Sequence, residues 1–393
     1  MLPALVNGTH RDAIVAVVER LIAEDAEGLV CADLDGVLDH ALAREHLARA
    51  GVLADPDGVA EQLLVRAIEQ APTAPDAPSG LYGGLARVGW LLAHLADGAD
   101  ADAAGAAIDA RLLRSTAPEA RHFDLISGLA GLGLLAAERG QRGVSLAAFV
   151  VERLEATAQP RHDGVAWYTP PAWLPPHHLA DAPDGYWNLG VAHGTPGVIA
   201  ALANLVHAGL ETERAGRLLD RAVAFLLAAE PPRAGDRFAD WHPRPARRGR
   251  RMAWCYGDLS VAIALLVAAR ARRRADWEAD AIALARSVAS RTGDDAAIVD
   301  PGLCHGSAGA AHLFGRLWHA TGEPAFRAAA LHWIDDTLAR CAASPRRGGA
   351  LLYGAPGIAL ALGAALGGGE PAWDRVLGIG PLAGYSPRRD WQD

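Results

Sequence analysis

The sequence contains no lysine, so the 37 residues counted as Lys or Arg are all arginines. Schiff-base catalysis and a phosphate-binding P-loop both require a lysine, and both are therefore excluded. Also missing are an apolar run of about eighteen residues and a basic N-terminal segment followed by an apolar core. We therefore expect no membrane span and no signal peptide.

A surplus of positive charge is absent as well. The 393 residues have a formal net charge of −9, whereas a nucleic-acid-binding protein carries a basic surface. We expect no nucleic-acid partner and a cytoplasmic location. Only four cysteines occur, and in the cytoplasm free or metal-bound thiols are favoured over disulfides.

A glycine turn that leads into an apolar helix occurs six times. The first aligned glycines of these turns are Gly84, Gly128, Gly194, Gly257, Gly306 and Gly354. The intervals between them are 44, 66, 63, 49 and 48 residues, and a period of roughly forty to fifty residues is typical of helix-pair arrays. The two long intervals contain loop-like insertions at 160–188 and 230–251.

Two kinds of helix alternate along these repeats. The helices that follow the turns, such as 198–208 and 261–269, are apolar on all sides and should be fully buried. Between them lie amphipathic helices such as the one at 326–338, with one apolar face. The alternation predicts an all-α fold, an α/α toroid with inner and outer helices and six visible repeats. In a closed ring every glycine turn lies at the same end.

The N-terminal region carries no such turn. Helical patterns occur at 10–23 and 59–70, followed by a connector with three prolines. We expect a single domain over 1–393. It comprises motif-poor helices at 1–78, glycine-turn repeats at 79–366 and a C-terminal tail at 367–393.

Three metal-ligand residues lie within two positions of a turn glycine: Cys255, Cys304 and His305. A lone cysteine is more often a small buried apolar residue, and we interpret Cys31 and Cys341 in that way. Equivalent places in two repeats, however, should bring Cys255 and Cys304 together. Two thiolates and an imidazole suit zinc, and three protein ligands leave a fourth position open, as in catalytic sites.

Four further residues are candidates for catalysis. His193 directly precedes Gly194, as His305 precedes Gly306, and its near-neutral pKa suits proton transfer. Asp124 is a candidate partner of His193, although it could equally be an N-cap. Arg251 offers a fixed cation and Tyr256 a hydrogen-bond donor beside Cys255. His312 is interpreted as a core or lining residue.

At this point the chain resembles the LanC-like lanthionine synthetases, the cyclases of class I lanthipeptide biosynthesis. The resemblance covers residues 79–366 and rests on three motifs within the repeats: 188–197 (NLGVAHGTPG), 254–257 (WCYG) and 303–306 (LCHG). It implies seven inner and seven outer helices, so the seventh pair should come from the N-terminal region. Two repeats depart from the pattern, with Arg87 and Ser260 where the others have a second glycine.

The resemblance also implies site roles and an activity. Zinc would be held by Cys255, Cys304 and His305, with His193 as the catalytic histidine. Asp124, Arg251 and Tyr256 would support it. The activity would be the addition of peptide cysteine thiolates to dehydroalanine or dehydrobutyrine, which closes thioether rings. The expected substrate is a dehydrated precursor peptide made by a separate dehydratase, and we expect the cyclase to be a monomer.

Other functions remain open from the residues alone. A zinc hydrolase or a glycosidase on an α/α barrel is one, although a glycosidase needs paired carboxylates and the turns supply only Asp124 and Asp258. A relative that adds glutathione and a non-catalytic scaffold for a peptide or a dehydratase are others. Two loops are candidates for binding the precursor. One contains Arg244, Arg247, Arg248, Arg250 and Arg251, and the other contains Trp167, Tyr168, Trp173 and Trp187.

Overall fold

The structure, a computed structural model, describes residues 1–26, 33–55, 57–161, 164–229, 237–243, 251–343, 348 and 350–382. Within these residues the chain forms fifteen α-helices and five short strands. None of the helices in the described part of the chain is both long and apolar enough to cross a bilayer.

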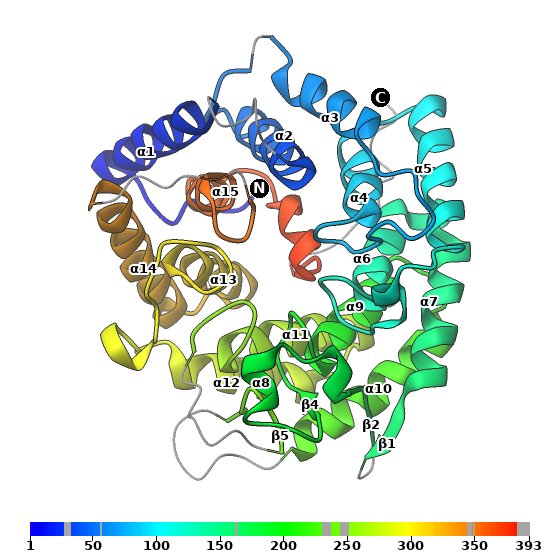
Figure 1. Ribbon diagram of the computed structural model, residues 1–393. Helices are drawn as coiled ribbons and strands as arrows, with labels where there is room; N and C mark the ends of the chain where they lie inside the picture. The colour runs from blue at the N-terminus through cyan, green and yellow to red at the C-terminus, as the bar shows by residue number, and fades with distance from the viewer. Residues whose placement is uncertain are drawn as a thin grey trace.

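Seven helices form an inner ring, in which each contacts the next and the last contacts the first (Figure 1). In order they are α2 (Leu34–Arg49), α4 (Leu85–Leu95), α6 (Leu129–Arg139), α9 (Thr195–His207), α11 (Asp258–Arg272), α13 (Ser307–Thr321) and α15 (Ala355–Ala365). As predicted, α9 and α11 are buried on nearly all sides.

Seven outer helices cover the inner ring. They are α1 (Gly8–Ala26), α3 (Val59–Glu69), α5 (Ala99–Leu112), α7 (Val144–Thr157), α10 (Thr212–Ala228), α12 (Ala275–Val288) and α14 (Pro324–Ala343). Six of them pack on the inner helix that precedes them, whereas α1 packs on α15. The two ends of the chain thus share the seventh pair, which closes the ring. The predicted toroid with seven helix pairs is confirmed.

Glycines allow the inner helices to begin against a neighbouring backbone. Gly257, directly before α11, has a φ of 100°, which L-residues with a side chain rarely adopt. A Cβ on Gly357, in the first turn of α15, would collide with the carbonyl oxygen of Leu351. The repeated glycines therefore serve close packing at one end of the ring.

A seventh helix pair was expected from the N-terminal region, but the position of its inner helix α2 was not predicted, because no glycine turn precedes it. Its N-cap is Asp33, whose side chain accepts a hydrogen bond from the Gly36 N–H at 2.9 Å. One turn further on, the buried Asp39 forms an ion pair with Arg87 of α4 and accepts a hydrogen bond from the Leu351 N–H at 2.6 Å. Arg87, which occupies the place of a second glycine, thus pairs with a carboxylate at the junction between α15, α2 and α4.

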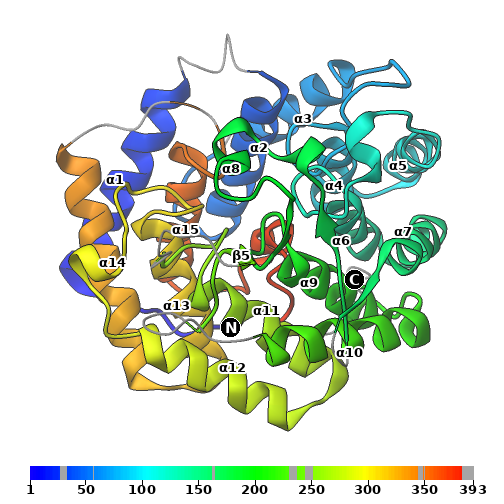
Figure 2. The ribbon, with the colours of Figure 1, turned by 60° about the horizontal axis from the view of Figure 1, so that its bottom comes forward.

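The two expected insertions contain all five strands. The first carries β1 (Gln159–Arg161), β2 (Gly164–Ala166), β3 (Tyr168–Thr169), α8 (Pro176–Leu179) and β4 (Tyr186–Asn188), and the second carries β5 (Trp241–His242). Strands β1 and β2 pair with each other, and β3, β4 and β5 form a second antiparallel sheet. The segment around α8 stands above the ring at one end (Figure 2).

Five short 3-10 helices complete the secondary structure: η2 (Pro118–Arg121), η3 (Gly140–Gly143), η4 (Pro171–Trp173), η5 (Gly293–Asp295) and η6 (Ala372–Leu377). The last lies inside the ring (Figure 1). Trp254 Nε1 donates to the Leu377 carbonyl at 2.9 Å, and Asp374 pairs with His312 at 2.9 Å. The region expected to be a C-terminal tail therefore begins with a buried segment that fills the ring axis.

Candidate metal centre and active site

Backbone hydrogen bonds join the glycine turns of neighbouring repeats. The Ala192 N–H donates to the Cys255 carbonyl at 3.3 Å, and the Trp254 N–H donates to the Cys304 carbonyl at 2.8 Å. The Cys304 N–H in turn donates to the Leu352 carbonyl at 2.8 Å. Turns that are far apart in the sequence are thereby held side by side at one end of the ring.

The three predicted metal ligands form a cluster there. The sulfur atoms of Cys255 and Cys304 and a ring nitrogen of His305 all lie within 4.8 Å of one another. A tetrahedral zinc with bonds of about 2.0–2.3 Å holds its ligand atoms less than about 4 Å apart, so small movements would close the site. Two buried thiols and one imidazole match the donor set that zinc prefers.

Asp300 fixes the orientation of the His305 ring. Its Oδ2 lies 3.1 Å from His305 Nε2, and its Oδ1 accepts a hydrogen bond from the Gly302 N–H at 2.6 Å. The hydrogen bond that His305 donates to Asp300, followed by its hydrogen bond with Cys255, raises the pKa of His305 to about 9. Asp300 was not predicted, although the Asp-Pro-Gly sequence that precedes the Cys304-His305 pair is a recognisable turn.

A hydrogen bond couples the two thiols and moves their pKa values in opposite directions. The hydrogen bond from the Cys304 thiol is the largest cause that lowers the pKa of Cys255, and His305 and the positive charge of Arg251 act in the same direction. The same hydrogen bond and burial raise the pKa of Cys304. One sulfur is thus readily ionised, as a metal ligand must be. Arg251 is exposed, and its charge reaches both sulfurs.

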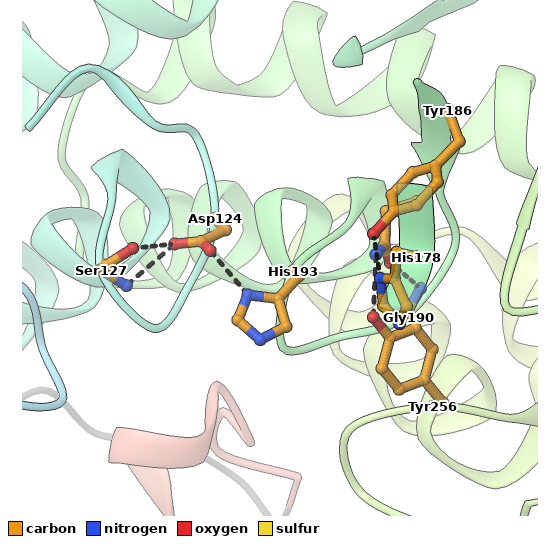
Figure 3. Close-up of polar contacts among 8 residues, drawn as sticks. Asp124, Ser127, His178, Tyr186, Gly190, His193 and Tyr256 are labelled. Carbon is orange, nitrogen blue, oxygen red and sulfur yellow. Dashed lines mark hydrogen bonds and ion pairs between the residues drawn. The ribbon is translucent and has the colours of Figure 1, made fainter. Parts of the chain in front are cut away.

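His193 and Asp124 form an ion pair on the adjacent turns (Figure 3). Asp124 Oδ2 lies 2.7 Å from His193 Nδ1, and its Oδ1 accepts hydrogen bonds from the N–H and hydroxyl of Ser127 at 2.8 and 3.1 Å. Burial lowers the pKa of His193, but the hydrogen bond and charge of Asp124 outweigh it and raise that pKa overall. The His193 side chain is 48% exposed, so Nε2 is the ring nitrogen available to a substrate.

Tyr256 is held by the first insertion. Asn188, the last residue of β4, donates from Nδ2 to the Tyr256 hydroxyl at 2.9 Å and accepts from the Gly190 N–H at 2.8 Å. Burial raises the pKa of Tyr256, so its phenol keeps its proton and can donate it in a hydrogen bond. A similar contact lies beside it, where His178 Nδ1 is 2.9 Å from the Tyr186 hydroxyl (Figure 3).

Tyr353 is a further residue at the metal cluster that was not predicted as a site residue. Its hydroxyl donates a hydrogen bond to the Cys304 sulfur, and its ring centroid lies 5.4 Å from that of His305. Although Tyr353 directly precedes Gly354 in the sixth turn, nothing in the sequence separates it from a surface tyrosine.

In the aromatic loop expected to bind the precursor peptide, the four side chains differ in their exposure to solvent. Trp167 is fully buried, and its Nε1 donates to the Leu154 carbonyl at 3.0 Å, so the prediction that it contacts a peptide was wrong. Tyr168 and Trp187 pack against each other at 4.9 Å, whereas Trp173 is exposed.

Several other predicted residues can be placed. The structure buries His312 and Cys341, which confirms the interpretation of both as core residues. The remaining predicted residues, Cys31, Arg244, Arg247, Arg248 and Arg250, lie outside the described part of the chain.

Comparisons with known proteins agree with this arrangement. The family described as "Lanthionine synthetase C-like protein" matches residues 46–377. Among solved structures, nisin cyclase superposes with a TM-score of 0.74 at 17% sequence identity, over 92% of this chain and 96% of that chain. At such low identity, the superposition shows a shared fold. No curated protein sequence matches significantly.

Proposed function

The chain belongs to the lanthionine synthetase C-like family, and from this premise we propose that it is a zinc-dependent lanthipeptide cyclase. It closes thioether rings by intramolecular addition of peptide cysteine thiols to dehydroalanine or dehydrobutyrine. The observation that carries the proposal is the cluster of Cys255, Cys304 and His305 beside the turns that hold the Asp124–His193 pair.

In this proposal Cys255, Cys304 and His305 hold one zinc ion. Asp300 engages His305 Nε2, which leaves Nδ1 for the metal, and such carboxylate partners commonly orient zinc-bound histidines. When bound, zinc supplies an open coordination position at which a substrate thiol ionises near neutral pH. The hydroxyl of Tyr353, which donates to Cys304, would moderate the charge of that ligand.

The addition forms a sulfur–carbon bond at the β-carbon of the dehydro residue, and the electron pair of its double bond moves toward the α-carbon and the carbonyl oxygen. In this proposal the guanidinium of Arg251 and the phenol of Tyr256 stabilise the negative oxygen. Protonated His193 then donates its Nε2 proton to the α-carbon. The proton released by the thiol balances this donation, so no oxidant or reductant is consumed.

Asp124 has a positioning role in this scheme. It binds Nδ1 of His193 at 2.7 Å and is itself fixed by Ser127. The interaction directs Nε2 toward the substrate and keeps the ring protonated to a higher pH. An acid that must act near neutral pH gains from such a shift.

The substrate in this proposal is a precursor peptide in which a separate dehydratase has removed water from serine and threonine. We also propose that residues 1–393 act as one domain, as a monomer and in the cytoplasm. The packing of α1 on α15 supports the first of these points, because the N-terminal residues then complete the same ring as the repeats.

The proposal is tested by the metal content of the purified protein. We expect about one zinc per chain in the wild type, none in Cys304→Ala, and an unchanged content in Cys341→Ala, a matched control whose cysteine is buried elsewhere. A cyclisation assay then counts the free thiols of a dehydrated peptide. Wild-type protein that binds no zinc and closes no ring would favour the scaffold function.

A further inference from the structure

Large apolar side chains are exposed around the end of the ring that carries the glycine turns. Trp173, Leu179 and Tyr353 are 38%, 36% and 54% exposed. Exposed aromatic and aliphatic side chains beside a functional site can contact a bound ligand. Two of these three residues are aromatic, and aromatic residues contribute strongly to binding.

Tyr353 lies on the side of the metal ligands. Its hydroxyl contacts Cys304 and its ring lies beside His305. The hydroxyl thus lies beside Cys304, while much of the ring stays open to solvent. An aromatic side chain has only two rotatable side-chain bonds, so it loses little conformational freedom when a ligand packs on it.

Trp173 lies on the side of His193. Its ring packs against that of His122 at a centroid distance of 4.0 Å and an interplanar angle of 37°, and His122 is two residues before Asp124, the partner of His193. Trp173 ends η4, three residues before α8 begins at Pro176, and the segment around α8 stands above the ring (Figure 2). Leu179 is the last residue of α8, so it belongs to the same overhanging segment.

We propose that Trp173 and Tyr353 form an apolar cradle for the substrate, which selects precursor peptides with large apolar residues next to the ring-forming positions. The inference rests on the proposed cyclase function. The reacting cysteine must reach the metal ligands, so its neighbour in the peptide packs on Tyr353. The dehydro residue must reach His193, so its neighbour packs on Trp173, with Leu179 at the edge.

The test uses two synthetic peptides, each with one cysteine and one dehydroalanine at the same spacing. In one, leucine flanks both reacting residues, and in the other serine flanks both. For the wild type we expect the KM of the leucine peptide to be about tenfold lower, since well-packed aromatic contacts are commonly worth that much in binding. The maximal rates should be similar.

Substitutions at Trp173 and Tyr353 test whether the cradle causes this difference in KM. Trp173→Ala should raise the KM of the leucine peptide about threefold, because one of the two contacts that give the tenfold preference is lost, with little change in kcat, and Trp173→Phe should restore most of the loss. Tyr353→Ala should likewise remove about half of the preference on a logarithmic scale, and the double alanine variant should remove all of it. Val65→Ala, a change at an exposed residue of the outer helix α3, is the matched control and should have no effect.

The outcomes separate this inference from the proposed function. If the wild type closes rings but Trp173→Ala leaves the KM of both peptides unchanged, the cradle is refuted and the cyclase stands. Equal KM values of the two peptides in the wild type would refute the cradle as well. A loss of dehydratase binding in Trp173→Ala, with unchanged peptide kinetics, would also overturn it and assign the surface to a protein partner. If the wild type closes no ring in either peptide, the proposed function itself fails.

Discussion

Replacement of Asp39 by alanine should open the junction at which the ring closes. Asp39 of α2 is paired with Arg87 of α4, and their side chains are only 5% and 1% exposed. The other carboxylate oxygen of Asp39 accepts the hydrogen bond of the Leu351 N–H, in the turn that precedes α15. One side chain thus connects three neighbouring inner helices, and its removal leaves a buried guanidinium without its carboxylate.

The size of the effect follows from that geometry. Removal of one partner from a buried ion pair costs about 3–5 kcal/mol, and a buried N–H left without an acceptor costs about 1–3 kcal/mol. Because the ion pair and the hydrogen bond share one carboxylate, their costs do not simply add. We expect Asp39→Ala to lower the free energy of unfolding by about 5 kcal/mol, the upper end of the range for a broken ion pair. Burial, only partly offset by Arg87, raises the pKa of Asp39 from 3.8 to about 6. Ionisation of Asp39 therefore lowers stability as the pH rises through that interval.

The prediction is tested by measuring the free energy of unfolding in urea for four proteins: wild type, Asp39→Ala, Arg87→Met and the double variant. The double variant should be more stable than Asp39→Ala, because the uncompensated charge has gone. Asp276→Ala, which removes an exposed partner of Arg274, is the control and should change the midpoint little. The reasoning is refuted if Asp39→Ala costs no more than Asp276→Ala, or if the two single costs simply add in the double variant.

Three other changes test the site. In Asp124→Asn the pKa of His193 should fall, so the loss of kcat/KM on the alkaline side should begin at lower pH. The Asp124–His193 pair stabilises the folded protein at pH values below the pKa that histidine has in the unfolded chain, and this stabilisation is lost as the pH rises through the pKa of His193 in the folded protein. In Asp124→Asn this pH-dependent stabilisation should be absent. Gly257→Ala places a Cβ against the Arg251 carbonyl at a positive φ, so zinc content and stability should fall, the latter by at least about 1–3 kcal/mol. Gly369→Ala, with open space around it, should change neither quantity. A chelator should lower the melting temperature and abolish ring closure, and zinc should restore both; unchanged melting would contradict the metal site.

The toroid was predictable because its signal is local and repeated. A glycine at the start of each apolar helix reports a close approach of backbones, and six copies reveal the ring. The helix α2 escaped prediction for a specific reason. Its buried face includes Asp39 and His40, which indicate an exposed face when the sequence is considered alone. Their burial depends on partners such as Arg87, 48 residues away, and the sequence does not show that pairing.

The same distinction applies to the site. Cys255, Cys304 and His305 were recognisable because their residue types are rare and lie at equivalent places in the repeats. Asp300 and Asn188 are common polar residues in loops, and only the fold shows that one contacts His305 and the other Tyr256. Nor could the sequence separate the buried Trp167 from the exposed Trp173, since both belong to the same aromatic insertion.

The buried segment η6 has a consequence for how products leave. It lies on the ring axis, held by hydrogen bonds with Trp254 and His312. A peptide that reaches the glycine turns therefore meets this buried segment and not an open channel along the axis. A bridged peptide is a branched chain, wider than an extended strand, and here it need not thread through a narrow pore. It departs through the opening by which it arrived.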